Sequence, residues 1–183
     1  MTALPEQRVR LTVDELERYA AEHGRCELID GEVFHMSPAG TNHGDITGAL
    51  HAYLGYFALE NKLGRVYTAE TGFRVSGEQT VRAPDIAFIR SDRVPAIRHG
   101  YAEVMPDLVV ETVSPNDKLS DVNAKIDWWL AQGVRLAWVV DPSTQQVTAH
   151  DGSDTVRVFR GDKPLDGGDV VPGFTLPLGK VFN

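Results

Sequence analysis

The segment LVVETV at residues 108–113, together with the helix and strand that follow it, decides the fold. It is a nearly continuous apolar run of strand length, which indicates a strand covered on both faces. A second apolar run, LAWVV at 136–140, ends at Asp141-Pro142. The segment between the two runs stops at Gly133 and has apolar residues at helical spacing: Leu119, Val122, Ile126, Trp129 and Leu130. The order strand, helix, strand predicts a helical crossover within one sheet.

The segments before this unit complete an α/β pattern. Val66–Val75 and Pro84–Ile89 are strand candidates, and Asp92–Pro106 is a polar connection with two prolines. Apolar residues at helical spacing predict a helix from about His43 to Asn61. The order from residue 43 is therefore helix, strand, strand, strand, helix, strand. We expect a mixed β-sheet flanked by helices.

Both ends of the chain add elements to this core. Thr12 and Glu15 form a capping-box pattern and predict a helix over 13–22. Cys26–Met36, with Asp30-Gly31 as the turn signal, predicts a strand pair or one bent strand. The tail after residue 142 predicts hairpins and loops. With 183 residues, 42% of them hydrophobic, we expect one domain over 1–183 with its core at about 43–142.

Composition restricts the class of protein. The net charge of -8 argues against binding nucleic acid through bulk electrostatics, because phosphate contacts need Lys and Arg. It does not exclude an acidic metal site, since a bound cation offsets the carboxylates. The single Cys26 excludes an internal disulfide, and the N-terminus shows no secretory signal. These two features predict a cytoplasmic location. No apolar run is long enough to cross a bilayer, so we expect no membrane partner.

Two acidic residues lie inside apolar strands. Asp85 follows Pro84 at the start of one strand candidate, and Glu111 lies within LVVETV. A carboxylate at a covered strand position is costly unless it is paired or holds a metal ion. The alternative for either residue alone is a place at a strand end that faces water.

Lys125 lies at the border of the apolar stripe on the helix that follows Glu111. At about 3.3 Å per residue, Glu111 lies roughly 10 Å back along its strand from Ser114. At about 1.5 Å per residue, Lys125 lies roughly 12 Å along its helix from Asp117. The helix runs back over the sheet, so Lys125 and Glu111 should be nearly level. The alternative is a surface ion pair with Asp121, one turn earlier.

These residues resemble the restriction-endonuclease-like PD-(D/E)XK nuclease superfamily. Within it the chain is similar to a bacterial group known as "putative restriction endonucleases". The resemblance covers about residues 12–142 and implies a restriction-endonuclease-like core with an N-terminal helix–strand extension and C-terminal hairpins. The matching motifs are Pro84-Asp85, Glu111, Asp121-Val-Asn-Ala-Lys125, Gly133-Val134, Trp138-Val-Val-Asp141-Pro142, Glu27-Leu-Ile-Asp30-Gly31-Glu32, Met36-Ser-Pro38 and His43.

One position departs from the superfamily pattern. The usual lysine lies two residues after the second acid, and that position here is Val113. In the group that the chain resembles, the lysine lies on the following helix, as Lys125 does. The different position of the lysine concerns catalytic turnover, whereas the two acids keep the positions that the superfamily pattern gives them.

The resemblance implies a metal-dependent endonuclease that hydrolyses phosphodiester bonds in DNA, with a homodimer as a candidate assembly. Asp85 and Glu111 would hold Mg²⁺ or Mn²⁺ as hard oxygen ligands, with the Thr112 carbonyl as an additional ligand. Lys125 would position or deprotonate the attacking water and offset charge in the transition state.

Glu27 and His43 are further candidates. Glu27 would add a carboxylate to the metal cluster, and the alternative is an exposed residue at a strand start. His43 would contact phosphate, and the alternative is a place beside an N-cap formed by Thr41 or Asn42. The three tryptophans are predicted to be core or interface aromatics: Trp128, Trp129 and Trp138.

Two other functions remain open from the sequence. One is a nuclease-fold module without turnover that binds nucleic acid or serves in assembly, which the net charge of -8 and Val113 favour. The other is a hydrolase of a different phosphoester, such as a nucleotide, which an acidic surface tolerates better.

Overall fold

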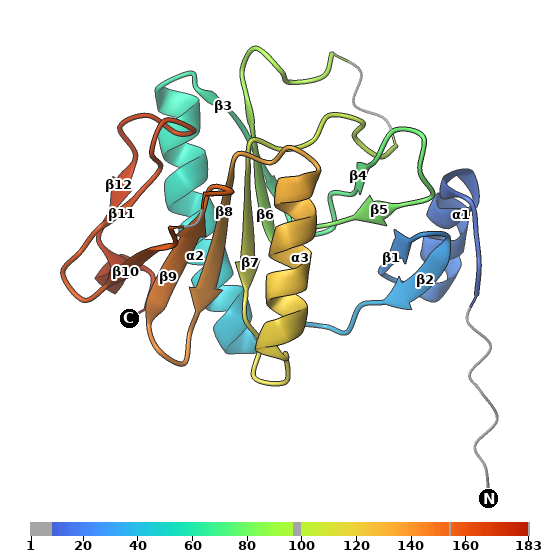
Figure 1. Cartoon of the computed structure of the whole chain (residues 1–183), viewed down its shortest axis with the longest axis horizontal. Helices are drawn as coiled ribbons and strands as arrows, with labels where there is room; N and C mark the ends of the chain where they lie inside the picture. Colours follow the sequence, from blue (N-terminus) through green and yellow to red (C-terminus); the bar gives the residue numbers. More distant parts are fainter. Residues whose placement is uncertain (1–8, 97–99, 154, 183) are drawn as a thin grey trace, which may run out of the picture.

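Six strands form the main sheet of the computed structural model, which describes residues 9–96, 100–153 and 155–182 (Figure 1). Its order is β10-β9-β8-β7-β6-β3. Strands β7 and β8 run parallel, and the other neighbours in the sheet are antiparallel. The sheet is therefore mixed, as the sequence predicts. The strand bounds are β3 Gly64–Thr68, β6 Ile86–Arg90, β7 Leu108–Thr112, β8 Leu136–Asp141, β9 Gln146–His150 and β10 Arg157–Arg160.

Two helices cover the opposite faces of this sheet (Figure 1). Helix α2, Thr41–Glu60, lies on the face to which Val110 of β7 points, and helix α3, Leu119–Ala131, lies on the face to which Val109 points. Adjacent β7 residues point to opposite faces because side chains alternate along a strand. Helix α3 is the predicted crossover between β7 and β8, and it places residues of its buried stripe beside the end of β7.

A smaller sheet packs with helix α1 and is joined directly to the main sheet. Its order is β2-β1-β5-β4, with bounds Glu32–His35, Cys26–Ile29, Val81–Arg82 and Phe73–Arg74. Helix α1, Val13–His23, contributes Val13 and Leu16 to the core of this sheet, and Glu15 accepts a hydrogen bond from the Thr12 amide, as the capping box predicts. Only residues 83–85 separate β5 from β6, so the two sheets meet at that point.

The structure corrects two predictions about element boundaries. The stretch Val66–Val75 is not one strand, because the chain leaves the main sheet after β3 and joins the small sheet at β4. The turn between them contains Glu70 at φ 81 and Gly72, where an added Cβ would lie 2.5 Å from Tyr101. Helix α2 begins at Thr41 after an N-cap at Gly40, so neither Thr41 nor Asn42 is the cap.

The C-terminal part forms the predicted hairpins. β9 pairs with β10, and β11, Leu165–Asp166, pairs with β12, Thr175–Leu176, before a 3-10 turn at Leu178–Lys180. The connection at 92–106 contains no helix or named strand in its described residues, and 97–99 lie outside them. Residues 1–8, where no secretory signal is expected, also lie outside. No described helix is both long and apolar enough to cross a membrane.

Candidate functional site

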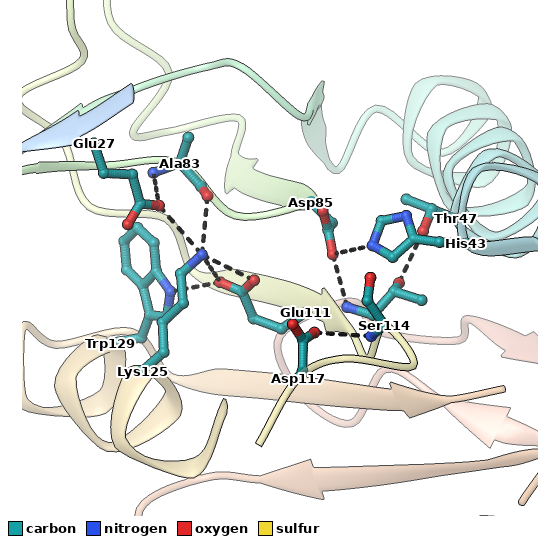
Figure 2. Close-up of polar contacts among 11 residues, drawn as sticks. Glu27, His43, Thr47, Ala83, Asp85, Glu111, Ser114, Asp117, Lys125 and Trp129 are labelled. Atoms are coloured by element: carbon teal, nitrogen blue, oxygen red, sulfur yellow. Dashed lines mark hydrogen bonds and ion pairs between the residues drawn. The ribbon is translucent and has the colours of Figure 1, made fainter. Parts of the chain in front are cut away.

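The three core candidates gather where β7 ends. Glu111 and Thr112 are the last two residues of this strand. The pairing of Ile86 with Val110 places Asp85, one residue before β6, at the next cross-strand position beside Glu111. Helix α3 brings Lys125 to Glu111, and Figure 2 shows the polar contacts around these two side chains and a separate set around Asp85.

Glu111 is buried and has two donors from α3. Its Oε2 accepts a hydrogen bond from Lys125 Nζ at 3.0 Å, and its Oε1 accepts one from Trp129 Nε1 at 2.9 Å. Burial raises the pKa of the Glu111 carboxyl to about 7; the Lys125 charge opposes this shift, and the charges of Asp85 and Glu27 add to it. The site therefore holds its central acid near its titration point at neutral pH.

Lys125 lies between two carboxylates. Its Nζ is 3.0 Å from Glu111 and 3.2 Å from Glu27, and it donates a hydrogen bond to the Ala83 carbonyl at 3.2 Å. Burial lowers the pKa of Lys125, but the charges of Glu111 and Glu27 outweigh it and the net pKa is raised. The ammonium therefore keeps its proton at neutral pH. It suits positioning and charge stabilisation, and the alternative of a general base stays a prediction.

The alternative of a surface ion pair between Lys125 and Asp121 does not describe the structure. Asp121 is exposed and accepts a hydrogen bond from Ser120 Oγ at 3.2 Å, whereas Lys125 faces inward. The contact between Lys125 and Glu111 agrees with the length comparison made from the sequence. The catalytic roles of these residues stay predictions.

Glu27 is buried, so the alternative of an exposed residue at a strand start is wrong. From β1, its Oε1 accepts a hydrogen bond from the Ala83 amide at 3.0 Å, and its Oε2 lies 3.8 Å from Arg82 Nε. Among the described residues, no group of three or more His, Cys, Asp or Glu side chains is placed to hold a metal ion. Glu27 is therefore the second counter-charge of Lys125 in this structure, and its role as a metal ligand stays a prediction.

Asp85 turns toward α2. Its Oδ2 accepts a hydrogen bond from the Thr112 amide at 2.7 Å and lies 3.1 Å from His43 Nε2. The hydrogen bond to Asp85 raises the pKa of His43, against an opposing effect of burial. Thr47, one turn further along α2, donates to the Thr112 hydroxyl at 2.8 Å. These contacts fix the first turns of α2 against the end of β7, with the Asp85 and Glu111 carboxylates turned to different partners (Figure 2).

A cleft of about 850 Å³ opens beside His43. Its walls come from the first turn of α2, residues 113–117 after β7, the start of α3, and β8 and β9. His43 is the candidate residue that lines this cleft and also contacts Asp85. The His43 side chain therefore lies between the cleft and Asp85.

Trp129 is the contact that sequence reasoning missed. It is buried, as predicted for a core aromatic, and its indole N–H is the donor to Glu111. Its position four residues after Lys125 places both side chains on one helix face, and this spacing was a usable signal. The backbone of Ala83, which contacts both Glu27 and Lys125, offers no such signal, because any residue type carries these groups.

Comparisons with known proteins give one family and one shared fold. A family model described as "Uma2: Putative restriction endonuclease" matches residues 13–179. The chain is similar to the crystal structure of a "putative nuclease belonging to DUF820" from Anabaena variabilis ATCC 29413, with TM-score 0.80 and 20% identity over 94% of this chain and 97% of that chain. It also aligns with the DrdV-DNA complex, with TM-score 0.42 and 18% identity over 79% of this chain and 11% of that chain. No curated protein matches.

Proposed function

Because this chain belongs to the Uma2 family, we propose that it is a Mg²⁺-dependent endonuclease that hydrolyses phosphodiester bonds in DNA, with a homodimer as its assembly. The observation that carries the proposal is the ion pair between Lys125 and Glu111 at the end of β7, beside Asp85. Two strand acids and a lysine are the residue set of the nuclease superfamily that the sequence resembles. Val113 occupies the position of the usual lysine, and Lys125 supplies the positive charge from helix α3 instead.

The residues present fit Mg²⁺ or Mn²⁺. Mg²⁺ in proteins commonly takes one or two carboxylates and completes its coordination with water and substrate phosphate. Glu111 near the end of β7 and Asp85 just before β6 are two such carboxylates, and the Thr112 carbonyl is the third proposed ligand. Glu27, Asp85 and Glu111 all act electrostatically on Lys125. A divalent cation would add a second positive centre for these carboxylates.

When bound, the ion would polarise the phosphate and stabilise the leaving oxygen. Lys125 would place a fixed positive charge beside the phosphate and orient the attacking water, whose proton would pass to the surrounding water. Trp129 would hold Glu111 in position through its hydrogen bond, and Glu27 would hold Lys125 in position through its ion pair. His43, with its raised pKa, would donate a hydrogen bond to a phosphate oxygen.

A cleavage assay tests the proposal. Purified protein is incubated with plasmid DNA and with bis(4-nitrophenyl) phosphate, with Mg²⁺, Mn²⁺ or EDTA, and binding of Mn²⁺ is measured separately. We expect metal-dependent cleavage of DNA that Lys125→Met abolishes. Lys118→Met is the matched control, because Lys118 is exposed at the N-cap of α3 and lies outside the site.

The outcomes separate the alternatives that the sequence leaves open. Cleavage of the small diester without cleavage of DNA would favour a hydrolase of another phosphoester. No cleavage and no Mn²⁺ binding would favour a binding or assembly module. A Lys118→Met variant that loses activity while Lys125→Met keeps it would show that the lysine is wrongly assigned.

A further inference from the structure

The cleft beside His43 has a lining unlike that of a phosphate-binding surface. No Lys or Arg is among the described residues that line it. It presents amides, hydroxyls and imidazoles between apolar side chains, and two carboxylates, Asp117 and Asp141. Asp117 accepts a hydrogen bond from the Ser114 amide, and hydrogen bonds from Ser143 and Thr144 outweigh partial burial and lower the pKa of Asp141. Phosphate groups would therefore be repelled from the cleft floor, while an uncharged group with polar edges would be accepted.

The size of the cleft suits one small group. Its volume of about 850 Å³ falls within the range of small-molecule sites, which is roughly 300–1,000 Å³. Asn123 from α3 and the pair of Thr148 and His150 from β9, whose side chains lie 3.1 Å apart, supply hydrogen-bonding groups on two walls of the cleft. Burial lowers the pKa of His150, so its flat imidazole ring is uncharged at neutral pH. A nucleobase has the flat faces and polar edges that such a lining recognises.

The place of the cleft links it to the acids. His43 lines the cleft and lies 3.1 Å from Asp85, which sits beside Glu111 across the strand pair. A base held in the cleft would bring its own phosphate to His43 and the two acids. A base stacked within an intact duplex cannot enter such a cleft, because it must first leave its neighbours.

We propose that this cleft binds one unstacked nucleobase next to the cleaved phosphate, so that single-stranded or locally unpaired DNA is the preferred substrate. This inference rests on the proposed function, since it uses the position of the phosphate. It also accounts for the net charge of -8. Duplex binding draws much of its affinity from phosphate contacts, which this chain is poorly charged to make. A base pocket supplies affinity that does not depend on net charge.

The test measures binding without turnover. Fluorescence anisotropy in EDTA compares a labelled oligothymidylate with a duplex of equal length. Thr148→Trp narrows the cleft, and Thr175→Trp, at the exposed position of β12, is the same change outside its lining. We expect the wild type to prefer the single strand, and Thr148→Trp to weaken single-strand binding by about tenfold, since holding one base is worth that order of free energy. Thr175→Trp should leave binding unchanged.

A second variant keeps the test decisive if Thr148→Trp does not fold. Asn123 is exposed on α3, so Asn123→Ala should fold and weaken single-strand binding by about threefold, as expected for one lost hydrogen bond. Equal wild-type affinity for duplex and single strand would overturn the inference, as would wild-type binding by both cleft variants. A wild-type dimer that Thr148→Trp converts to a monomer would also overturn it, because the cleft would then hold a second copy of the chain.

Failure of this inference is distinguishable from failure of the proposed function. If the cleft inference holds, Thr148→Trp lowers oligonucleotide cleavage by about tenfold more than cleavage of bis(4-nitrophenyl) phosphate, which carries no base. Metal-dependent cleavage with unchanged single-strand binding in the cleft variants would retain the nuclease and reject the pocket. Absence of all cleavage with weakened single-strand binding would retain the pocket and reject the nuclease.

Discussion

Two buried acids stand at the two ends of β7 and differ in the charges around them. Asp107, 1% exposed, comes directly before the strand and accepts hydrogen bonds from the Arg90 amide at 2.9 Å and Arg93 Nη1 at 2.6 Å. Glu111, 8% exposed, lies near the other end and faces Lys125. Asp107 is matched by one cation, whereas Lys125 is shared by Glu111 and Glu27 with Asp85 nearby.

This difference shows that burial of an acid does not by itself mark a site. Both side chains have hydrogen-bond partners, and both pair with a basic residue. An acid matched one to one with its cation has no charge left for a ligand, as expected of a structural pair. Three carboxylates that share Lys125 and Arg82 are the arrangement that a further cation would complete. We therefore assign Asp107 to the fold and Glu111 to the candidate site.

The largest expected effect is on turnover. Glu111→Gln should lower metal-dependent DNA cleavage by about a hundredfold or more, because it removes one of the two proposed carboxylate ligands of the ion. Asp107→Asn should leave the rate per folded molecule unchanged. Initial rates of plasmid nicking, normalised to folded protein by circular dichroism, check both. A Glu111→Gln enzyme with half of the wild-type rate would remove this acid from the proposed site.

The free energy of unfolding should fall more in Asp107→Asn than in Glu111→Gln, which is the opposite of the order expected for turnover. Asp107→Asn should destabilise the fold by about 2–3 kcal/mol, near the lower limit for breaking a buried pair. The Arg93 side chain is 38% exposed and recovers part of its hydration, which reduces the cost. Metal-free Glu111→Gln should cost under about 1 kcal/mol, since Lys125 keeps Glu27. Urea unfolding in EDTA measures both changes, and equal losses would contradict the contrast between the acids.

Trp129→Phe should weaken the metal site more than the fold. The phenyl ring keeps part of the packing, and Glu111 loses the indole N–H, which leaves Lys125 as the partner of Oε1. Mn²⁺ affinity should fall by about tenfold, as for other groups that orient a metal ligand. Trp128→Phe is the matched control, because Trp128 packs under Arg82 and is outside the Glu111 contacts. Titration followed by electron paramagnetic resonance gives both affinities; equal values would make Trp129 a core residue only.

The pH dependence of stability should single out Glu111 in the metal-free protein. Its folded pKa, raised to about 7, exceeds its ordinary value of 4.5, so the folded state binds the proton more tightly than the unfolded state. This contribution is present at low pH and is lost as pH rises from 4.5 through 7. Between about pH 5.5 and about pH 7, the wild type should lose on the order of 1 kcal/mol more than Glu111→Gln. Urea titrations in EDTA at both pH values test this difference, and parallel curves would contradict it.

The sequence was sufficient for elements whose signals are local. Apolar runs and helical spacing located β7, α3 and β8, and helix and strand lengths placed Lys125 level with Glu111. The break after Thr68 was missed, because the following residues continue a strand-like pattern and the turn depends on packing against Tyr101. The burial of Glu27 depends on Ala83 and Lys125, which lie 56 and 98 positions away in the chain. Asp107 gave no signal either, since its partner Arg93 lies across an irregular connection.

The link between the two sheets at Ala83 has a consequence for mutational scanning. The Ala83 amide donates to Glu27 and its carbonyl accepts from Lys125, so the residue spans the gap between the small sheet and α3 with main-chain atoms alone. Replacement of the methyl side chain leaves both hydrogen bonds in place for every residue type except proline, which lacks the N–H. A scan of single substitutions would therefore score position 83 as tolerant of every residue except proline. The main-chain atoms of this residue nevertheless connect Glu27 to Lys125.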